Sequence, residues 1–71
     1  MAEEILSPLS GKIFKLMVAV GDKVEEDDET IILEAMKMET PIFAPCDGTI
    51  SEIKVKEGDT VSEDDVLAVI S

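Results

Sequence analysis

The sequence predicts an all-β fold, a flattened sandwich or barrel built from two similar halves of about four strands each. Three observations lead to this fold class: an internal repeat, turn-forming residues placed between short β-branched runs, and an aliphatic composition. The chain has 71 residues and is 45% hydrophobic, but it contains only two aromatic residues. A chain of this length has room for one small domain with one modest core.

The repeat has an offset of 37 residues, so that residues 5–34 align with residues 42–71, and eleven of the thirty aligned pairs are identical. Most of the identical residues are turn formers or β-branched residues. They are Ile5/Ile42, Pro8/Pro45, Gly11/Gly48, Ile13/Ile50, Val18/Val55, Gly21/Gly58, Asp22/Asp59, Val24/Val61, Glu26/Glu63, Asp27/Asp64 and Asp28/Asp65. We therefore expect the two halves to fold alike around an approximate two-fold axis.

Each half is expected to contain a strand before a proline, a longer strand after a glycine, a very short strand after a Gly-Asp turn, and a final apolar strand. In the first half these features are Pro8, Gly11 with residues 13–18, Gly21-Asp22 with Val24, and residues 30–35. In the second half they are Pro45, Gly48 with residues 50–55, Gly58-Asp59 with Val61, and residues 66–70.

Residues 25–40 are ambiguous, because they include good helix formers that can be arranged on one helical face. The second copy decides between helix and strand. Its matching run, residues 66–70, is β-branched and too short for a stable helix. Pro41 also disfavours a helix that continues past Thr40. The segment is therefore predicted to be a strand and a hairpin.

The charge balance excludes several classes of partner. Six basic residues stand against seventeen acidic ones, for a net charge of −11, which repels nucleic acid and anionic membranes. The longest apolar run, residues 16–20, is far shorter than the roughly 20 residues that cross a bilayer. The acidic start at residues 1–4 lacks the basic region of a signal peptide. These features predict a cytoplasmic protein without nucleic-acid partners or direct membrane insertion.

The residue types also limit the chemistry. Cys46 is the single cysteine and there is no histidine, so neither an internal disulfide, a zinc site nor a Ser/His/Asp triad is expected. We expect no catalytic residue, no metal site and no enzyme activity. Acidic residues at 25–29 and 63–65 leave calcium open, although their repetition favours solvated turns. Cys46 aligns with Leu9, which predicts a packed thiol.

The junction between the two copies contains Lys37, flanked by Met36 and Met38. It follows the last strand of the first half, so a hairpin there should lie at the pole opposite the chain ends. The ordinary interpretation is that the methionines are core and that Lys37 is a solvated surface lysine. Turn tips usually carry Gly, Asn or Asp, however, and exposed methionines suit a surface read by another protein.

The segment Glu34-Ala35-Met36-Lys37-Met38-Glu39-Thr40 resembles the biotin-attachment motif of biotinyl domains in biotin carboxyl carrier proteins and related carboxylase, decarboxylase and transcarboxylase subunits. The likeness extends over essentially the whole chain, including both proline-to-glycine turns and both Gly-Asp turns. It implies a barrel-sandwich hybrid of two four-stranded sheets over residues 1–71. It also implies biotin attached covalently to Lys37, with Met36, Met38 and Ala35 serving ligase recognition and positioning.

The resemblance further implies a non-catalytic carrier. Its partners would be a biotin–protein ligase, a biotin carboxylase subunit, and a carboxyltransferase or decarboxylase subunit. Asp27 and Asp64 stand where the family often has glycine, but aspartate tolerates a left-handed turn. A lipoyl domain is one alternative, although its lysine usually follows an acidic residue and precedes a small one. An unmodified interaction module is the other.

Overall fold

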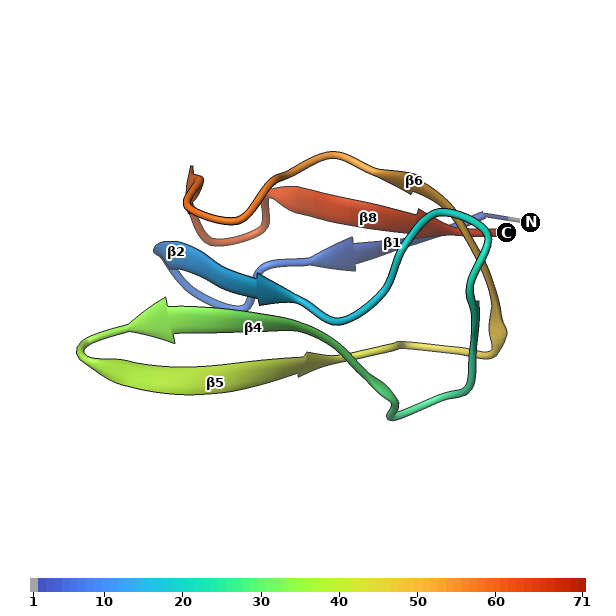
Figure 1. Cartoon of the computed structure of the whole chain (residues 1–71), viewed down its shortest axis with the longest axis horizontal. Helices are drawn as coiled ribbons and strands as arrows, with labels where there is room; N and C mark the ends of the chain where they lie inside the picture. The colour runs from blue at the N-terminus through green and yellow to red at the C-terminus, as the bar shows by residue number, and fades with distance from the viewer. Residues whose placement is uncertain (1) are drawn as a thin grey trace.

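The computed structural model describes residues 2–71, which form eight strands and contain no helix. The strands are β1 (Glu3–Leu6), β2 (Gly11–Leu16), β3 (Lys23–Val24), β4 (Glu29–Ala35), β5 (Met38–Phe43), β6 (Gly48–Ile53), β7 (Thr60–Val61) and β8 (Val66–Ile70). They form two four-stranded sheets, in the orders β1-β8-β6-β3 and β5-β4-β2-β7 (Figure 1). The predicted all-β fold of two four-stranded sheets is confirmed.

The two sheets obey the predicted two-fold symmetry. In the repeat, β1 to β4 of the first half correspond to β5 to β8 of the second half. When each strand in the first sheet is replaced by its repeat partner, the order of the second sheet results. Every sheet takes strands from both halves, so neither half forms a sheet alone. Residues 25–40 contain β4 and the start of β5, which confirms the strand prediction for the ambiguous segment.

The long strand of each half starts and ends two residues earlier than predicted. It covers Gly11–Leu16 in the first half and Gly48–Ile53 in the second. The register with β4 explains the shift, since it pairs Lys12 with Glu34 at one end and Leu16 with Ile31 at the other. Pairing thus begins at the glycine itself, which the sequence pattern had assigned to the turn.

The core is aliphatic, as the composition predicts. The buried hydrophobic residues are Ile5, Ile13, Val24, Ile31, Leu33, Ala35, Ile42, Ala44, Ile50, Val61, Leu67, Ala68 and Ile70. Leu9 and Cys46 are partly buried against this core, which confirms the packed cysteine. Neither phenylalanine belongs to the core, because Phe14 and Phe43 are each about half exposed. A large aromatic side chain left outside the core needs an explanation of its own.

The Gly-Asp turns have the same geometry in both copies. Gly21 and Gly58 have φ angles of 97° and 95°, in the left-handed region that glycine enters without strain. The carboxylate of Asp22 accepts a hydrogen bond from the backbone N–H of Ala19 at 2.9 Å. Asp59 accepts the matching bond from Lys56 at 2.9 Å. These aspartates close their own turns.

The acidic turns that followed the short strands are also structural. Asp27 and Asp64 both have φ 71°, so aspartate does occupy the left-handed positions where the family often has glycine. The carboxylate of Asp28 accepts the N–H of Glu25 at 2.9 Å, and that of Asp65 accepts the N–H of Ser62 at 2.8 Å. Within residues 2–71, no three acidic or cysteine side chains gather closely enough to hold a metal ion.

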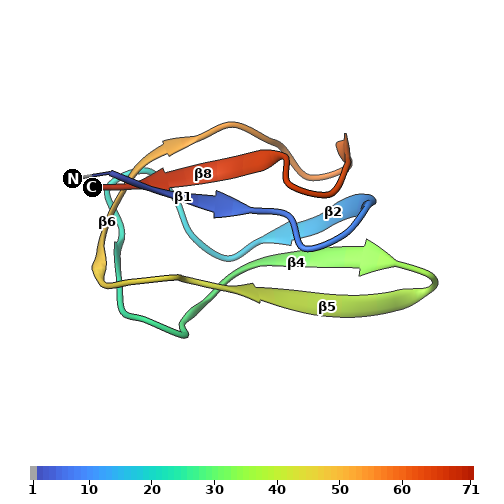
Figure 2. The same cartoon turned by 180° about the vertical axis from the view of Figure 1, so that it is seen from behind.

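The molecule is elongated, with principal extents of 32 × 17 × 17 Å. The turn between β4 and β5 lies at one end of the long axis, and both chain ends lie at the other (Figures 1 and 2). The predicted separation of the lysine hairpin from the chain ends is confirmed.

Candidate functional site

The candidate site is the β4–β5 hairpin, whose two-residue loop is Met36-Lys37. The two strands pair antiparallel in register from Ile32 opposite Pro41 to Ala35 opposite Met38. A two-residue loop joining strands in this register is the shortest common hairpin connection. The lysine is therefore held at a fixed place on a rigid ladder rather than on a long flexible loop.

The loop backbone is strained. Met36 has φ 53° and Lys37 has φ 64°, as the central residues of a type I′ turn require. That turn strongly prefers Asn-Gly or Gly-Gly, since other residues pay about 1–2 kcal/mol each for the left-handed conformation. Two adjacent residues that disfavour this backbone conformation at an exposed tip point to function, because strain of this kind concentrates at functional sites.

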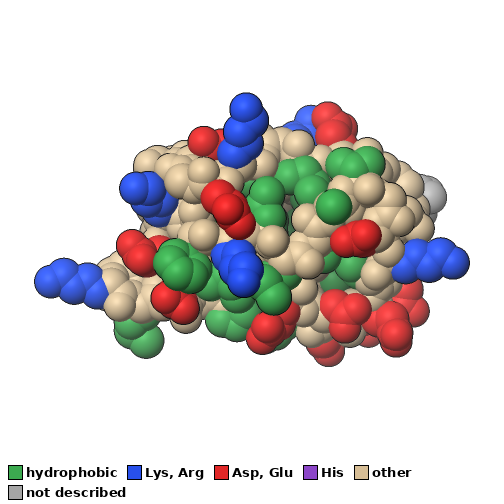
Figure 3. Space-filling view, viewed as in Figure 1, with side chains coloured by type: hydrophobic (Ala, Val, Ile, Leu, Met, Phe, Trp, Pro, Cys, Tyr) green, Lys and Arg blue, Asp and Glu red, His purple; other side chains and the backbone are tan. Residues whose placement is uncertain are grey.

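The side chains at the tip are exposed to solvent. Met36 is 91% exposed and Met38 is 68% exposed. Lys37 is also exposed, whereas Ala35 is 9% exposed and closes the end of the core. Figure 3 shows a basic side chain reaching out beyond the rest of the molecule at this end. The interpretation of the methionines as core residues is wrong, because the tight turn carries them past the end of the packed sheets.

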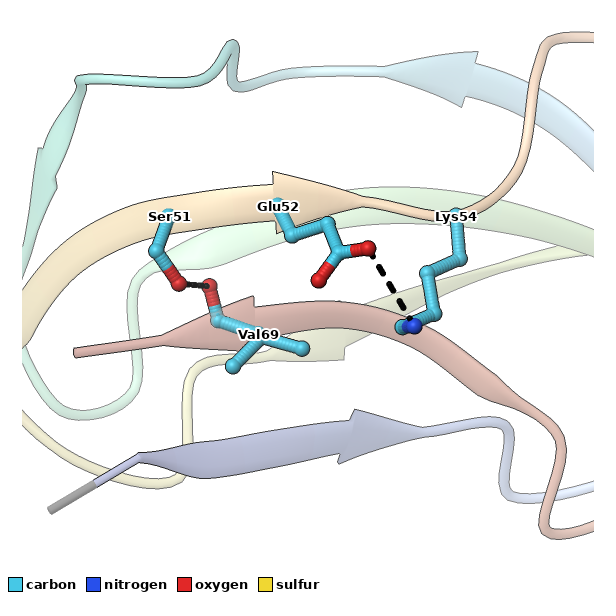
Figure 4. Close-up of polar contacts among 4 residues, drawn as sticks. All are labelled: Ser51, Glu52, Lys54 and Val69. Atoms are coloured by element: carbon cyan, nitrogen blue, oxygen red, sulfur yellow. Dashed lines mark hydrogen bonds and ion pairs between the residues drawn. The ribbon is translucent and has the colours of Figure 1, made fainter.

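The amine of Lys37 makes no ion pair with any other residue in the range 2–71. The one ion pair within that range joins Lys54 to Glu52 at 3.3 Å, on the other sheet (Figure 4). Lys37 is exposed, and its Nζ atom is free of ion pairs within the described residues. A covalent attachment to this nitrogen requires an accessible amine.

Two contacts hold the base of the hairpin. Gly11, at the start of β2, lies so close to β4 that a Cβ atom there would come within 2.5 Å of the carbonyl oxygen of Glu34 and 3.2 Å of the Cβ of Ala35. Further along, the buried hydroxyl of Thr30 donates to the carbonyl oxygen of Ile42 at 2.8 Å, which ties β4 to β5. The close approach of β2 fixes where the hairpin leaves the body.

Comparison with known proteins identifies the family of the chain. The model of the family described as "Biotin-requiring enzyme" matches residues 3–70. The chain belongs to this family. Its fold is that of the biotinyl domains, and the resemblance seen in the hairpin motif is confirmed at the level of the family.

Several relatives of this biotinyl domain have names that state a carrier or carboxyl-transfer role. The biotin carboxyl carrier protein of Streptococcus mutans is 49% identical over 41 residues, which are 58% of this chain and 32% of that protein. The methylmalonyl-CoA carboxyltransferase 1.3S subunit of Propionibacterium freudenreichii is 49% identical over 37 residues, 52% of this chain and 30% of that subunit. The chain thus spans about a third of the length of each of these relatives.

The same fold is present in a solved structure of a much larger enzyme. The urea carboxylase of Kluyveromyces lactis matches all of this chain with a TM-score of 0.94 and 42% identity, and the match occupies 6% of that protein. A biotinyl domain can therefore be one small part of a long carboxylase chain.

No helix among residues 2–71 has the length and hydropathy needed to cross a membrane.

The sequence predicted the residues at the tip of the candidate site but not the contacts that hold the base of the hairpin. Lys37, Met36, Met38 and Ala35 lie together at the hairpin tip, as expected from their adjacency. The role of Gly11 was not predicted, although its identity with Gly48 was a signal that a side chain does not fit at that place in the fold. The strain at Met36 was not predicted either, because Met-Lys is not a recognised turn sequence.

Proposed function

We propose that this chain is a biotin carrier, with biotin joined through an amide bond to the Nζ atom of Lys37. The observation that supports it best is the exposed lysine at a strained two-residue turn between two exposed methionines. Membership in the biotin-requiring family agrees with the assignment. We further propose that residues 1–71 act as one carrier domain, since residues 2–71 share a single core.

The chain's own part in the attachment is to present the amine. A biotin–protein ligase would activate the carboxyl group of biotin with ATP, and pyrophosphate would leave in that step. The Nζ of Lys37, deprotonated to the neutral amine, would then form the amide bond with that carboxyl carbon, lose a second proton and displace AMP. The modification removes one positive charge, so the net charge moves from −11 to −12. Met36, Met38 and Ala35 contribute the surface that the ligase recognises around the lysine.

Delivery is the remaining task. Biotin held on Lys37 would supply a ring nitrogen that can carry a carboxyl group to an acceptor. The rigid hairpin positions the start of the arm, and the long side chain lets its end move between a biotin carboxylase site and a carboxyltransferase or decarboxylase site. Tethering keeps the group near both at an effective concentration on the order of mM. The cytoplasmic location and the absence of nucleic-acid partners stay predictions of the sequence.

The direct test is the intact mass of the chain after co-expression with a biotin–protein ligase, followed by peptide mapping. We expect one biotinyl group on the peptide that contains Lys37 and none on Lys37→Ala. The Lys37→Ala chain should fold normally, because the side chain is exposed and makes no ion pair within residues 2–71. A folded chain that stays unmodified beside an active ligase would overturn the proposal. Modification by a lipoate ligase instead would establish the lipoyl alternative.

A further inference from the structure

The outer face of the hairpin sheet is unusually apolar. On β4, Ile31 and Leu33 point into the core while Ile32 between them is only partly buried. Ile32 pairs with Pro41 on one side and with Lys15 on the other. Phe14 is the extra residue where the β2–β4 register shifts, and it is 49% exposed. These residues therefore lie on the outer surface of the sheet.

We call this surface the hairpin-sheet face. It consists of Phe14, Met17, Ile32, Pro41 and Phe43. Phe43 is 50% exposed and Met17 is 47% exposed. In the space-filling view hydrophobic side chains lie over β4 and β5 with charged side chains among them, and a second hydrophobic group lies toward the end with the chain termini (Figure 3). Both aromatic residues of the chain are thus used on this face and not in the core.

The second copy of the repeat shows that the fold does not require this apolar face. Shifting by 37 residues places Ser51 at the position of Phe14 and Lys54 at that of Met17. The same shift pairs Pro41 with Glu4. Phe43 matches Leu6, which is 42% exposed, so this position is apolar in both copies. The difference between the two sheets therefore lies at Phe14, Met17 and Pro41.

Two polar side chains at the matching positions of the other sheet have partners close by. The hydroxyl of Ser51 donates to the carbonyl oxygen of Val69 at 3.2 Å, and Lys54 pairs with Glu52 at 3.3 Å (Figure 4). Val69 is the repeat partner of Ile32, so these contacts cover the matching stretch of sheet. At the positions of Phe14 and Met17 the other sheet thus has polar side chains with local partners, whereas the sheet that carries Lys37 exposes a ring and a thioether. Such a contrast indicates contact with a protein partner.

The charges around the face describe that partner. Glu29, Glu34 and Glu39 are exposed along β4 and β5, and Lys12 and Lys15 are exposed along β2. A complementary surface has an apolar centre, basic groups opposite β4 and β5, and acidic groups opposite β2. The net charge of −11 on each chain disfavours a second copy of this chain as that partner.

We infer that the hairpin-sheet face is the surface on which a biotin–protein ligase docks when it modifies Lys37. This inference rests on the proposed function. The face is continuous with the hairpin, because β4 and β5 form both its centre and the strands that carry the lysine. When Lys37 enters the catalytic site of the ligase, the rest of the ligase comes close to the hairpin-sheet face, because the same strands form both.

The ligase fits this contact better than the enzymes that use the carried group. The ligase acts on the Nζ of Lys37 itself, so its catalytic site must reach the hairpin tip and its body must lie beside the domain. Enzymes that act on the loaded cofactor meet it at the far end of a long arm, so their catalytic sites need not reach the hairpin tip. A hollow lined by Lys12, Ile13, Phe14, Glu34 and Gly58 opens beside Phe14 and offers room for a side chain of the ligase.

The test measures ligase kinetics with the chain as the varied substrate, in the presence of biotin and ATP. Phe14→Ser installs the residue that the second copy carries at the same fold position, so it is compatible with the backbone. We expect its KM to rise roughly tenfold with little change in kcat, because a buried aromatic anchor is lost from the complex. Ser51→Ala is the matched control at the equivalent position of the other sheet, and its KM should equal that of the unaltered chain.

Thermal unfolding of each variant separates an effect on docking from an effect on folding. Titration of the ligase with Lys37→Ala and with Phe14→Ser/Lys37→Ala measures docking without the attachment reaction. Weaker binding of the double variant than of Lys37→Ala supports the inference. An unchanged KM for Phe14→Ser, or an equal rise for Ser51→Ala, overturns it while leaving the carrier function intact. If the unaltered folded chain is not biotinylated at all, the proposed function fails and this inference fails with it.

Discussion

At the scale of single residues, Met36 is the residue whose place in the molecule is hardest to explain by stability. It is 91% exposed, so it contributes almost no burial, and its φ of 53° is unfavourable for a methionine. Asp27 has a similar φ of 71°, but aspartate is one of the residues that tolerate that conformation. The strain at Met36 is therefore compatible with selection for recognition of the turn and not for its stability.

Replacing Met36 should make the domain more stable. Asparagine is favoured at this position of a type I′ turn, so Met36→Asn is expected to raise the free energy of unfolding by about 0.5–1 kcal/mol. Urea unfolding, followed by circular dichroism, measures the change. The same variant should be a poorer ligase substrate, since the exposed thioether is lost.

Met38→Asn is the matched control, because Met38 lies in β5 and has no left-handed backbone angle. Asparagine is unfavourable in a strand, so this variant should be less stable by a few tenths of a kcal/mol to about 1 kcal/mol. If Met36→Asn lowered the free energy of unfolding as Met38→Asn does, backbone strain at Met36 would not be what limits the stability of the turn.

At the scale of elements, the hairpin depends on how closely β2 approaches β4. Lys12 pairs with Glu34, and because Gly11 has no side chain, the strand can begin directly against the hairpin base. The matching glycine, Gly48, serves the opposite pole, where a Cβ atom would come within 2.3 Å of a methyl carbon of Ile70. The two glycines make the same kind of close approach, but only one of them supports Lys37.

Gly11→Ala should therefore destabilise the domain and disturb the hairpin. The nearest obstacle is a backbone oxygen, which cannot rotate away, so we expect a loss of about 1–3 kcal/mol. Amide chemical shifts of residues 34–38 should change, and the ligase should modify Lys37 more slowly. Gly48→Ala should lose stability without changing the shifts of those residues. Unchanged hairpin shifts in Gly11→Ala would show that the close approach does not position the turn.

Many of these strands were predictable because the two halves of the chain repeat, so each half can be compared with the other. The repeat resolved residues 25–40 as a strand and hairpin, which local propensity alone did not. It did not predict the irregular register between β2 and β4. Strict alternation after the buried Ile13 directs Phe14 outward, as observed, but it would direct Lys15 inward. Lys15 is exposed because the register shifts there, and that shift depends on tertiary pairing, which no local pattern encodes.

At the scale of the whole molecule, electrostatic repulsion works against folding. Seventeen acidic residues share a body of 32 × 17 × 17 Å with six lysines, and one ion pair forms within residues 2–71. That pair is exposed and is worth at most about 1 kcal/mol. Cohesion therefore comes from the aliphatic core and the backbone ladders, while the surface charge keeps copies of the chain apart.

Salt should accordingly stabilise the domain. Raising NaCl from about 20 mM to about 500 mM shortens the screening length from roughly 20 Å to about 4 Å, less than the width of the molecule. We expect the midpoint of thermal unfolding to rise by roughly 5 °C, which corresponds to about 1 kcal/mol for a domain of this size. Differential scanning calorimetry at several salt concentrations measures the slope.

The matched variant is Glu25→Gln/Glu26→Gln, which removes two exposed negative charges from one turn and changes the net charge from −11 to −9. The hydrogen bonds of that turn use the backbone N–H groups of both residues, and they remain available after the change. The variant should be more stable than the unaltered chain at low salt and should respond less to added NaCl. Equal slopes for the two chains would mean that salt acts through the apolar surface rather than through charge repulsion.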